Sequence, residues 1–291
     1  MQCSLLFDLA VIAENYGQMT GVLAGFSFTA LVLLMTPTQA AERAARSGDD
    51  GRATLALFSS FIALILATLI YSVLAGDTDE EARPRAATLE VIDGLVFGLA
   101  VISLLQGLYL IMRGANIDAS TVKIARFMAV VVFPSMGIYF VAQGASDTVA
   151  LRAAAEGGAC VPHVPVLGVL LTVAAASILS LSLGTRAQRA MAARGTRSGT
   201  IAPILVIGAS VAGAMAAGEV STYSPGFLMS PTAQNLYLTA VAVLVIAVGL
   251  MFSAAGAANV RKETRPDEET NGRISRPRPD KLAPESDSAS K

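Results

Sequence analysis

Charged residues are scarce in this chain of 291 residues. Asp, Glu, Lys and Arg together make up 15% of the sequence, whereas an ordinary soluble domain contains roughly 25%. Hydrophobic residues make up 54%. This balance is typical of an integral membrane protein. The net charge of −1 hides a strong asymmetry between the connections and by itself indicates no class of partner. Nucleic acid is not expected as a partner of such a membrane protein.

Histidine and cysteine are also rare, with one and two copies. The sequence contains no cluster of these residues with zinc-binding spacing, no HExxH motif and no Walker A loop. It also lacks an aspartate-rich pair that would hold magnesium, and the last apolar run has no lysine for a retinal Schiff base. The sequence therefore predicts neither a metal nor a cofactor.

Long apolar runs are the dominant feature of the chain. A helix needs about 20 apolar residues to cross a hydrocarbon core about 30 Å thick. The predicted spans are 21–35, 53–75, 91–112, 124–144, 166–184, 201–218 and 236–258. We therefore predict an all-α polytopic membrane protein, a bundle of seven transmembrane helices.

Three regions follow from these runs. Residues 1–19 are predicted to form an outer N-terminal segment at the membrane interface, and residues 20–258 the seven-helix transmembrane domain. The tail, 259–291, is charged and has almost no large apolar residues. It is predicted to be a disordered cytoplasmic segment, because it cannot bury enough surface to fold.

The positive charges predict the orientation of the bundle. Of the 21 Lys and Arg residues, 18 lie in the tail or in alternate connections between the predicted spans, all on one side of the membrane. The positive-inside rule places that side in the cytoplasm and the N-terminus outside. We therefore predict a multi-pass protein of the plasma membrane.

Small residues and one proline predict how the helices pack. Two stripes recur every four residues: Gly17, Gly21 and Gly25, and then Gly208, Ala212 and Ala216, with Ala209, Gly213 and Ala217 beside the second. Such stripes allow close approach of neighbouring helices. Pro134 lies inside the fourth span and predicts a kink there, because proline removes a backbone donor.

Polar side chains gather at the outer ends of the predicted spans. The candidate proton donors are Glu219, Asp93 and Glu14, and the candidate substrate-binding residues are Gln143, Tyr71, Tyr139 and Tyr237. Carboxylates at membrane depth are energetically expensive and indicate function. Glu219 ends its span, where the helix dipole disfavours an anion, whereas Asp93 opens its span, where the dipole favours one. The alternative interpretation is structural, since tyrosines and acids also form interfacial belts.

Two further features lie on the predicted outer side. Residues 220–234 carry no charge and contain Pro225, Gly226 and three apolar residues after them. This loop is predicted either to fold back as a lid or to lie along the membrane interface. Cys3 and Cys160 also fall outside, where a disulfide between them could persist.

Three classes of function fit this pattern. The first is an intramembrane enzyme that acts on a hydrophobic substrate, a lipid or an isoprenoid, by proton donation from a carboxylic acid. Its chemistry would follow that of integral-membrane terpene cyclases in outline, although no motif matches them. The alternatives are a cation-coupled transporter or channel, and a non-catalytic scaffold or accessory subunit. Acids gathered at one depth favour a one-sided pocket, so we rank the enzyme first, with membrane lipids and a hydrophobic small molecule as partners.

Overall fold

The computed structural model describes residues 9–36, 50–115, 117–159, 161–192 and 195–263, which form only helices and their connections. Six helical segments are long and apolar enough to cross a membrane. The elements are α1 (Leu9–Met35), α3 (Asp50–Gly76), η1 (Glu80–Ala82), α4 (Arg83–Gly114), α5 (Ala119–Phe127), the π-helical turn η2 (Met128–Val132), α6 (Phe133–Ala155), α7 (Val166–Ser182), α8 (Thr185–Ala192), α9 (Gly195–Ser221) and α10 (Pro231–Glu263). The predicted all-α architecture with several membrane spans is confirmed.

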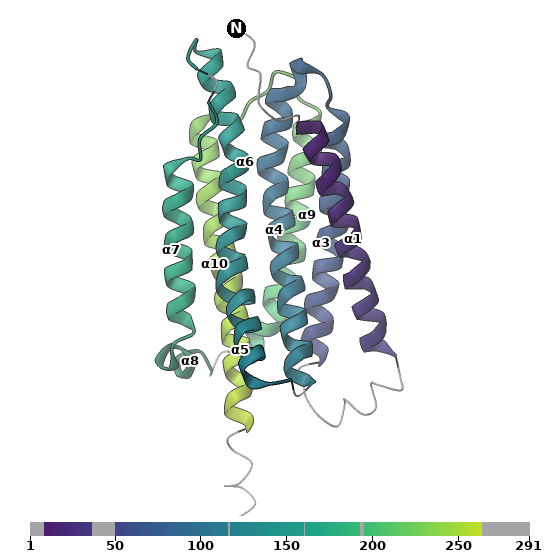
Figure 1. Ribbon diagram of the computed structural model, residues 1–291, viewed down its shortest axis with the longest axis vertical. Helices are drawn as coiled ribbons and strands as arrows, with labels where there is room; N and C mark the ends of the chain where they lie inside the picture. Colours follow the sequence, from purple (N-terminus) through teal and green to yellow (C-terminus); the bar gives the residue numbers. More distant parts are fainter. Residues whose placement is uncertain (1–8, 37–49, 116, 160, 193–194, 264–291) are drawn as a thin grey trace, which may run out of the picture.

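The helices form an elongated bundle with α4 near its centre (Figure 1). Helix α4 packs against α3, α6 and α9, while α1 packs almost entirely against α3. Helix α7 is apolar but shorter than the six long segments and packs against α6 and α10. The start of α1 and the end of α10 lie at opposite ends of the bundle (Figure 1).

We name the two ends by their charge. The acidic end carries the start of α1, η1, the α6–α7 connection and the α9–α10 connection. The basic end carries the α4–α5 connection, α8 and the end of α10 (Figure 1). The connections that were predicted to share a side of the membrane therefore share an end of the bundle.

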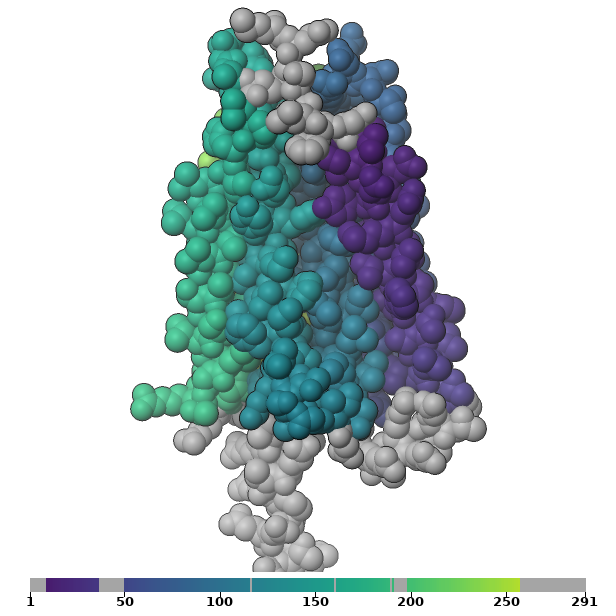
Figure 2. All heavy atoms as spheres, in the orientation of Figure 1, coloured from purple at the N-terminus to yellow at the C-terminus, as the bar shows by residue number. Residues whose placement is uncertain are grey.

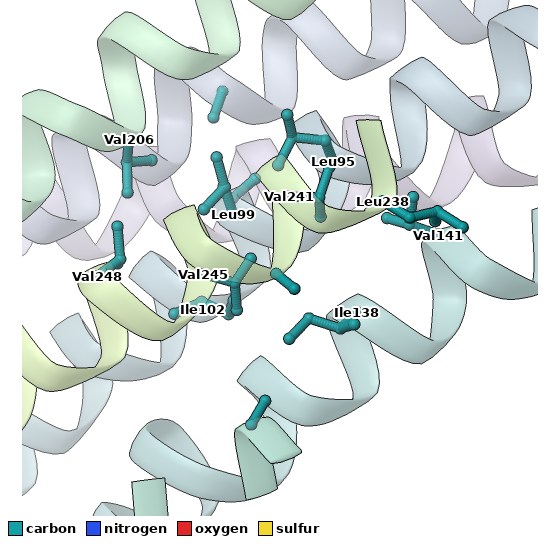
Figure 3. Packing of buried hydrophobic residues seen from close by; sticks show 14 of the residues in the cluster. Leu95, Leu99, Ile102, Ile138, Val141, Val206, Leu238, Val241, Val245 and Val248 are labelled. Atoms are coloured by element: carbon teal, nitrogen blue, oxygen red, sulfur yellow. The ribbon is translucent and has the colours of Figure 1, made fainter. Parts of the chain in front are cut away.

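Aliphatic side chains of α4, α6, α9 and α10 form the largest buried cluster (Figure 3). Leu99 and Ile102 of α4 face Ile138 of α6 and Val245 of α10 there (Figure 3). In a lipid environment such contacts stabilise by close packing and not by the exclusion of water. Close packing in turn explains the glycines at several helix crossings.

The two small-residue stripes differ from the sequence prediction in how they pack. In α9 the predicted main stripe, Gly208, Ala212 and Ala216, is exposed, whereas Gly213 and Ala217 beside it are buried. A Cβ atom at Gly213 would lie 2.6 Å from a methyl carbon of Val96, so this glycine is required for the approach of α4.

The glycines of α1 show the same difference. Gly17 packs against Tyr71 of α3, but Gly21 and Gly25 have no neighbour within 4 Å of the place a Cβ would take. The prediction from this spacing is therefore wrong for Gly21 and Gly25, and of the predicted α1 stripe only Gly17 lies at a helix contact.

The predicted irregularity at Pro134 is present. The segment from α5 to α6 contains the π-helical turn Met128–Val132, and α6 then begins with Pro134 in its first turn. A π turn before proline is a common way to accommodate the missing donor and the bulk of the ring.

Several sequence predictions concern the two ends of the chain or residues outside the described part. Helix α1 is continuous from Leu9, so residues 9–19 belong to the same helix as the first predicted span. Helix α10 continues to Glu263, five residues into the predicted tail. The proposed disulfide partners Cys3 and Cys160, and residues 264–291, lie outside the described residues.

Candidate functional site

Two carboxyl groups of α4 lie inside the acidic end. Asp93 is fully buried, and neither of its carboxyl oxygens makes a hydrogen bond of standard geometry in the described part of the chain; only the hydroxyl of Tyr71 approaches them. Glu90 lies one helical turn away, and its Oε2 atom is likewise buried without a partner. Because a buried ionised carboxylate is costly without compensation, this pair requires a proton, a cation or a ligand.

Two tyrosines enclose Asp93 from other helices. Tyr71 of α3 is buried, and its hydroxyl approaches the Asp93 carboxyl closely enough to donate a hydrogen bond. Tyr237 of α10 is half-buried and interacts electrostatically with Asp93. The Tyr237 hydroxyl donates a hydrogen bond of 3.1 Å to the carbonyl of Ile92, the residue before Asp93. This bond ties α10 to the backbone of α4 at the level of the acids.

A third carboxyl group approaches Glu90 from α6. Asp147 is half-buried and interacts electrostatically with Glu90. Gly144, one turn before Asp147, makes room for the Glu90 side chain, since a Cβ there would lie 3.5 Å from its Cγ. Glu90, Asp93 and Asp147, which we call the acid cluster, therefore come together from two helices.

Aromatic rings lie beside the acid cluster. Tyr16 of α1 stacks on Tyr71 with ring centroids 5.5 Å apart and an interplanar angle of 17°. Phe140 of α6 meets Tyr16 edge-on at 5.4 Å and lies 5.7 Å from Phe97 of α4. These four rings, from four different helices, form an aromatic cluster, and Tyr16 interacts electrostatically with Glu90.

An apolar groove opens on the side of the bundle below the aromatic cluster. It lies between α1 and α6 with α4 as its floor, and it is visible as a hollow between these helices (Figure 2). Its volume is about 370 Å³, within the usual range for small-molecule pockets. Phe97 and Phe140 line the groove and also belong to the aromatic cluster. We call it the lateral groove, because it faces the region that lipid tails would occupy.

The α9–α10 loop, residues 222–230, folds back over the acidic end next to α4. The Arg85 guanidinium holds it by donating to the carbonyl of Tyr223 at 2.9 Å. The same guanidinium makes a bidentate ion pair with Asp77, at 2.7 and 3.1 Å. Phe227 of this loop packs against the buried residues of α3 and α4. The apolar part of the loop thus faces the bundle, in agreement with its composition.

A second arginine fixes the other end of the loop. Arg152 of α6 donates to the carbonyl of Met229 at 2.6 Å and to the side chain of Gln234 at 3.2 Å. Gln234 also accepts a hydrogen bond from Thr148 at 2.9 Å. The loop is therefore attached to α4 through Arg85 and to α6 through Arg152.

The structure brings together some of the residues singled out from the sequence and separates the others. Asp93, Tyr71 and Tyr237 meet within the acidic end. The remaining candidates, Glu219, Glu14, Gln143 and Tyr139, have exposed side chains. Glu14 accepts a hydrogen bond of 3.4 Å from Gln18 on the outer face of α1. None of these four takes part in the acid cluster.

Three residues of the site were not singled out as candidates. Glu90, Asp147 and Tyr16 are polar residues on the same predicted outer side, but they are not among the candidates named from the sequence. Glu90 lies three residues before Asp93, so the two share a helix face, and this spacing is the signal that could have identified the pair. Nothing in the linear sequence connects Asp147 or Tyr16 to them.

Hydroxyl groups also bridge the helices deeper in the bundle, but in separate layers. Thr68 donates to Thr20 at 2.9 Å, and Ser27 and Ser60 lie 3.4 Å apart at a deeper level. Buried Ala24 and Leu64 fill the helical turns between these layers. The polar groups of α1 and α3 therefore do not form a continuous path from the acid cluster.

Among the described residues, no group of three or more His, Cys, Asp and Glu side chains has the geometry of a metal site. The described side chains gathered at the acidic end are carboxyl and phenol groups beside aromatic rings. The chain was also compared with protein-family models, curated proteins and solved structures, and none of them matches it.

Proposed function

We propose that this chain is an intramembrane enzyme that takes a hydrophobic substrate, a lipid or an isoprenoid, from the membrane and protonates it with a carboxyl of the acid cluster. One observation carries the proposal. An apolar groove that is open to the side ends at an aromatic cluster, and directly beside that cluster lie carboxyls with buried oxygens that form no ion pair among the described residues and have at most a tyrosine hydroxyl as a partner. Buried acids without a structural partner in or near a pocket are candidates for catalysis.

The substrate enters through the lateral groove and not from water. The α9–α10 loop, held by Arg85 and Arg152, covers the acidic end on the side of α4 and α10. The groove, in contrast, is lined by apolar side chains such as Leu23, Val101 and Met136. An alkyl or isoprenyl chain is the kind of ligand that such a lining accepts.

The proposed reaction is acid-catalysed isomerisation or cyclisation of an alkene. A carboxyl of Glu90 or Asp93 donates its proton to one carbon of a C=C bond, whose π electrons form the new C–H bond and leave a carbocation at the other carbon. The cation is attacked by a second double bond or rearranges, and it then loses a proton to a carboxylate of the acid cluster. Atoms and charge balance without a co-reactant. The rings of Tyr16, Phe97 and Phe140 can stabilise the cation by cation–π interaction.

The two alternative functions receive less support. A transporter or channel needs polar groups across the membrane, whereas the hydroxyl layers of α1 and α3 are separated by buried apolar residues. A scaffold explains the outward-facing Glu14 and Glu219, but it gives no reason for carboxyls inside the bundle that form no ion pair among the described residues.

We also propose that α7 is a seventh membrane span and that the acidic end faces outward. Helix α7 is 17 residues long and apolar, about 25 Å at the usual rise per residue. It leads from the acidic end back to the basic end beside α10 (Figure 1). With this span the lysine and arginine asymmetry of the connections obeys the positive-inside rule.

The test uses the purified protein in lipid nanodiscs made up in D₂O. Farnesol, geranylgeraniol and squalene are added separately, and the products are separated and weighed by gas chromatography and mass spectrometry. We expect an isomer or cyclised product that carries one deuterium. Glu90→Gln or Asp93→Asn should lower its rate by about 100-fold or more, the usual contribution of a general acid.

Two kinds of variant complete the design. Glu14→Gln and Glu219→Gln remove exposed acids outside the acid cluster and should leave the rate unchanged. Val101→Trp places a large ring in the floor of the groove and should reduce product formation while both carboxyls remain. If none of the three substrates reacts, and proton uptake into liposomes depends on Glu90 and Asp93, we would reject the enzyme proposal in favour of the cation-coupled transporter.

A further inference from the structure

The basic end contains a second group of charged side chains that the proposed reaction does not use. Arg113 lies in the last turn of α4, and Arg126 lies at the end of α5. The two guanidinium groups are close enough to interact electrostatically, and so are Arg126 and the hydroxyl of Tyr109 on α4. Two like charges and a hydroxyl thus share one region.

Both arginines donate hydrogen bonds to backbone carbonyls in the last part of α10. Arg113 donates to the carbonyl of Gly256 at 3.2 Å, and Arg126 donates to the carbonyl of Ser253 at 3.4 Å. Arg126 also donates to the side-chain oxygen of Gln188 on α8 at 2.6 Å. The hydrogen-bond acceptors of Arg126 in the described part of the chain are all neutral. Its Nε atom is buried there without a hydrogen-bond partner.

Ordinary helix electrostatics do not account for Arg126. A cation at the end of a helix is stabilised by the dipole, and this explains Arg113. Helix α5, however, continues through the π turn into α6, so its last carbonyls are not a free helix end. The carbonyls of Ser253 and Gly256 also lie inside α10, which continues to Glu263.

The side chains of Arg126 and Tyr109 both lie next to Gly256 of α10. A Cβ atom at Gly256 would lie 3.5 Å from Nε and Nη2 of Arg126 and 3.5 Å from the hydroxyl of Tyr109. Helices α5 and α4 therefore present the Arg126 guanidinium and the Tyr109 hydroxyl toward Gly256 of α10, and the Arg113 guanidinium of α4 donates to the carbonyl of the same glycine. A guanidinium fork with a neighbouring hydroxyl is suited to the oxygens of a phosphate group.

We infer that Arg113, Arg126 and Tyr109 form a binding site for a phosphate-bearing anion at the basic end of the bundle. The site lies where the helices end, at the level of lipid headgroups in a bilayer. An anionic phospholipid supplies the phosphate from the membrane, and inorganic phosphate would supply it from solution. The site is independent of the acid cluster at the other end.

The experiment measures the thermal unfolding midpoint of the delipidated protein in detergent against added dioleoylphosphatidylglycerol, dioleoylphosphatidylcholine and inorganic phosphate. A ligand that binds only the folded state raises the midpoint with its concentration. We expect phosphatidylglycerol to raise the midpoint and phosphatidylcholine to have little effect. Arg126→Gln should weaken the apparent affinity for phosphatidylglycerol by at least tenfold, and Arg126→Lys, which keeps the charge but loses the fork, should weaken it less.

The matched control is Arg186→Gln, which removes one exposed arginine of α8 at the same end and should bind like the wild type. Gly256→Ala keeps every charge but places a methyl group between Arg126 and Tyr109, so it should weaken binding several-fold. This second variant keeps the site testable if Arg126→Gln does not fold. Inorganic phosphate that stabilises equally and competes with the lipid identifies the source as free phosphate. Equal stabilisation of the wild type, Arg126→Lys and Gly256→Ala by phosphatidylglycerol, or no effect of either phosphate source, overturns the site.

Discussion

At the scale of single residues, Asp93 is the clearest case of an ionisable side chain buried at a cost to stability. It is completely buried, and no cation or backbone donor among the described residues compensates its carboxyl, which only the Tyr71 hydroxyl approaches. Residues of this kind destabilise a fold and persist where function needs them. The nearby ion pair of Arg85 with Asp77 is the opposite case, because both of its carboxyl oxygens are satisfied.

This contrast predicts opposite effects for the same substitution. Asp93→Asn removes, at constant size, the cost of placing an ionisable carboxyl in a buried site, where it must either hold an uncompensated charge or take up a proton. It should stabilise the protein by about 1–3 kcal/mol. Asp77→Asn breaks the charged bidentate contact and should destabilise it by about 1–2 kcal/mol. Unfolding in mixed detergent micelles measures both. A loss of stability in Asp93→Asn as large as in Asp77→Asn would show that Asp93 has a structural role.

At the scale of helices, the packing depends on where glycines lie relative to neighbouring backbones. Gly168 of α7 faces Ala142 of α6, and a Cβ at Gly168 would lie only 2.3 Å from the Cβ of Ala142. Gly208 of α9 is exposed and has no neighbour within 4 Å of the corresponding position. Both glycines are helical, so they form a matched pair.

Gly168→Ala should push α7 away from α6 and cost about 1–3 kcal/mol, the usual range for overpacking. Gly208→Ala should be neutral or slightly stabilising, because alanine is favoured over glycine inside a helix by up to about 1 kcal/mol. The same detergent unfolding assay distinguishes them. A cross-link between cysteines placed on α6 and α7 tests the displacement, and an unchanged cross-linking yield in Gly168→Ala would contradict it.

At the scale of the whole molecule, the main prediction concerns topology. In a background with Cys3→Ala and Cys160→Ala, single cysteines are introduced as Glu156→Cys at the acidic end and Ser120→Cys at the basic end. A membrane-impermeant maleimide should label the first in intact cells and the second only after permeabilisation. Labelling of the second alone in intact cells would reverse the proposed orientation.

The sequence by itself determined the membrane class, the helical architecture and the grouping of the polar residues at one end. These properties depend on the lengths of apolar runs and on the charges between them, which are linear features. Asp93, Tyr71 and Tyr237 are the candidates predicted from the sequence that lie within the site, because their depth along the helix was readable from position.

Only the tertiary structure decided which polar residues face inward. Each residue turns a helix by about 100°, so the face that packs on a neighbour determines the direction of every side chain. Ala217 packs inward in α9, and Glu219, two residues later, therefore points outward. In α4 the same geometry turns Glu90 toward Gly144 and Asp147 of α6. The acid cluster exists because two helices meet, and no pattern within either helix encodes that meeting.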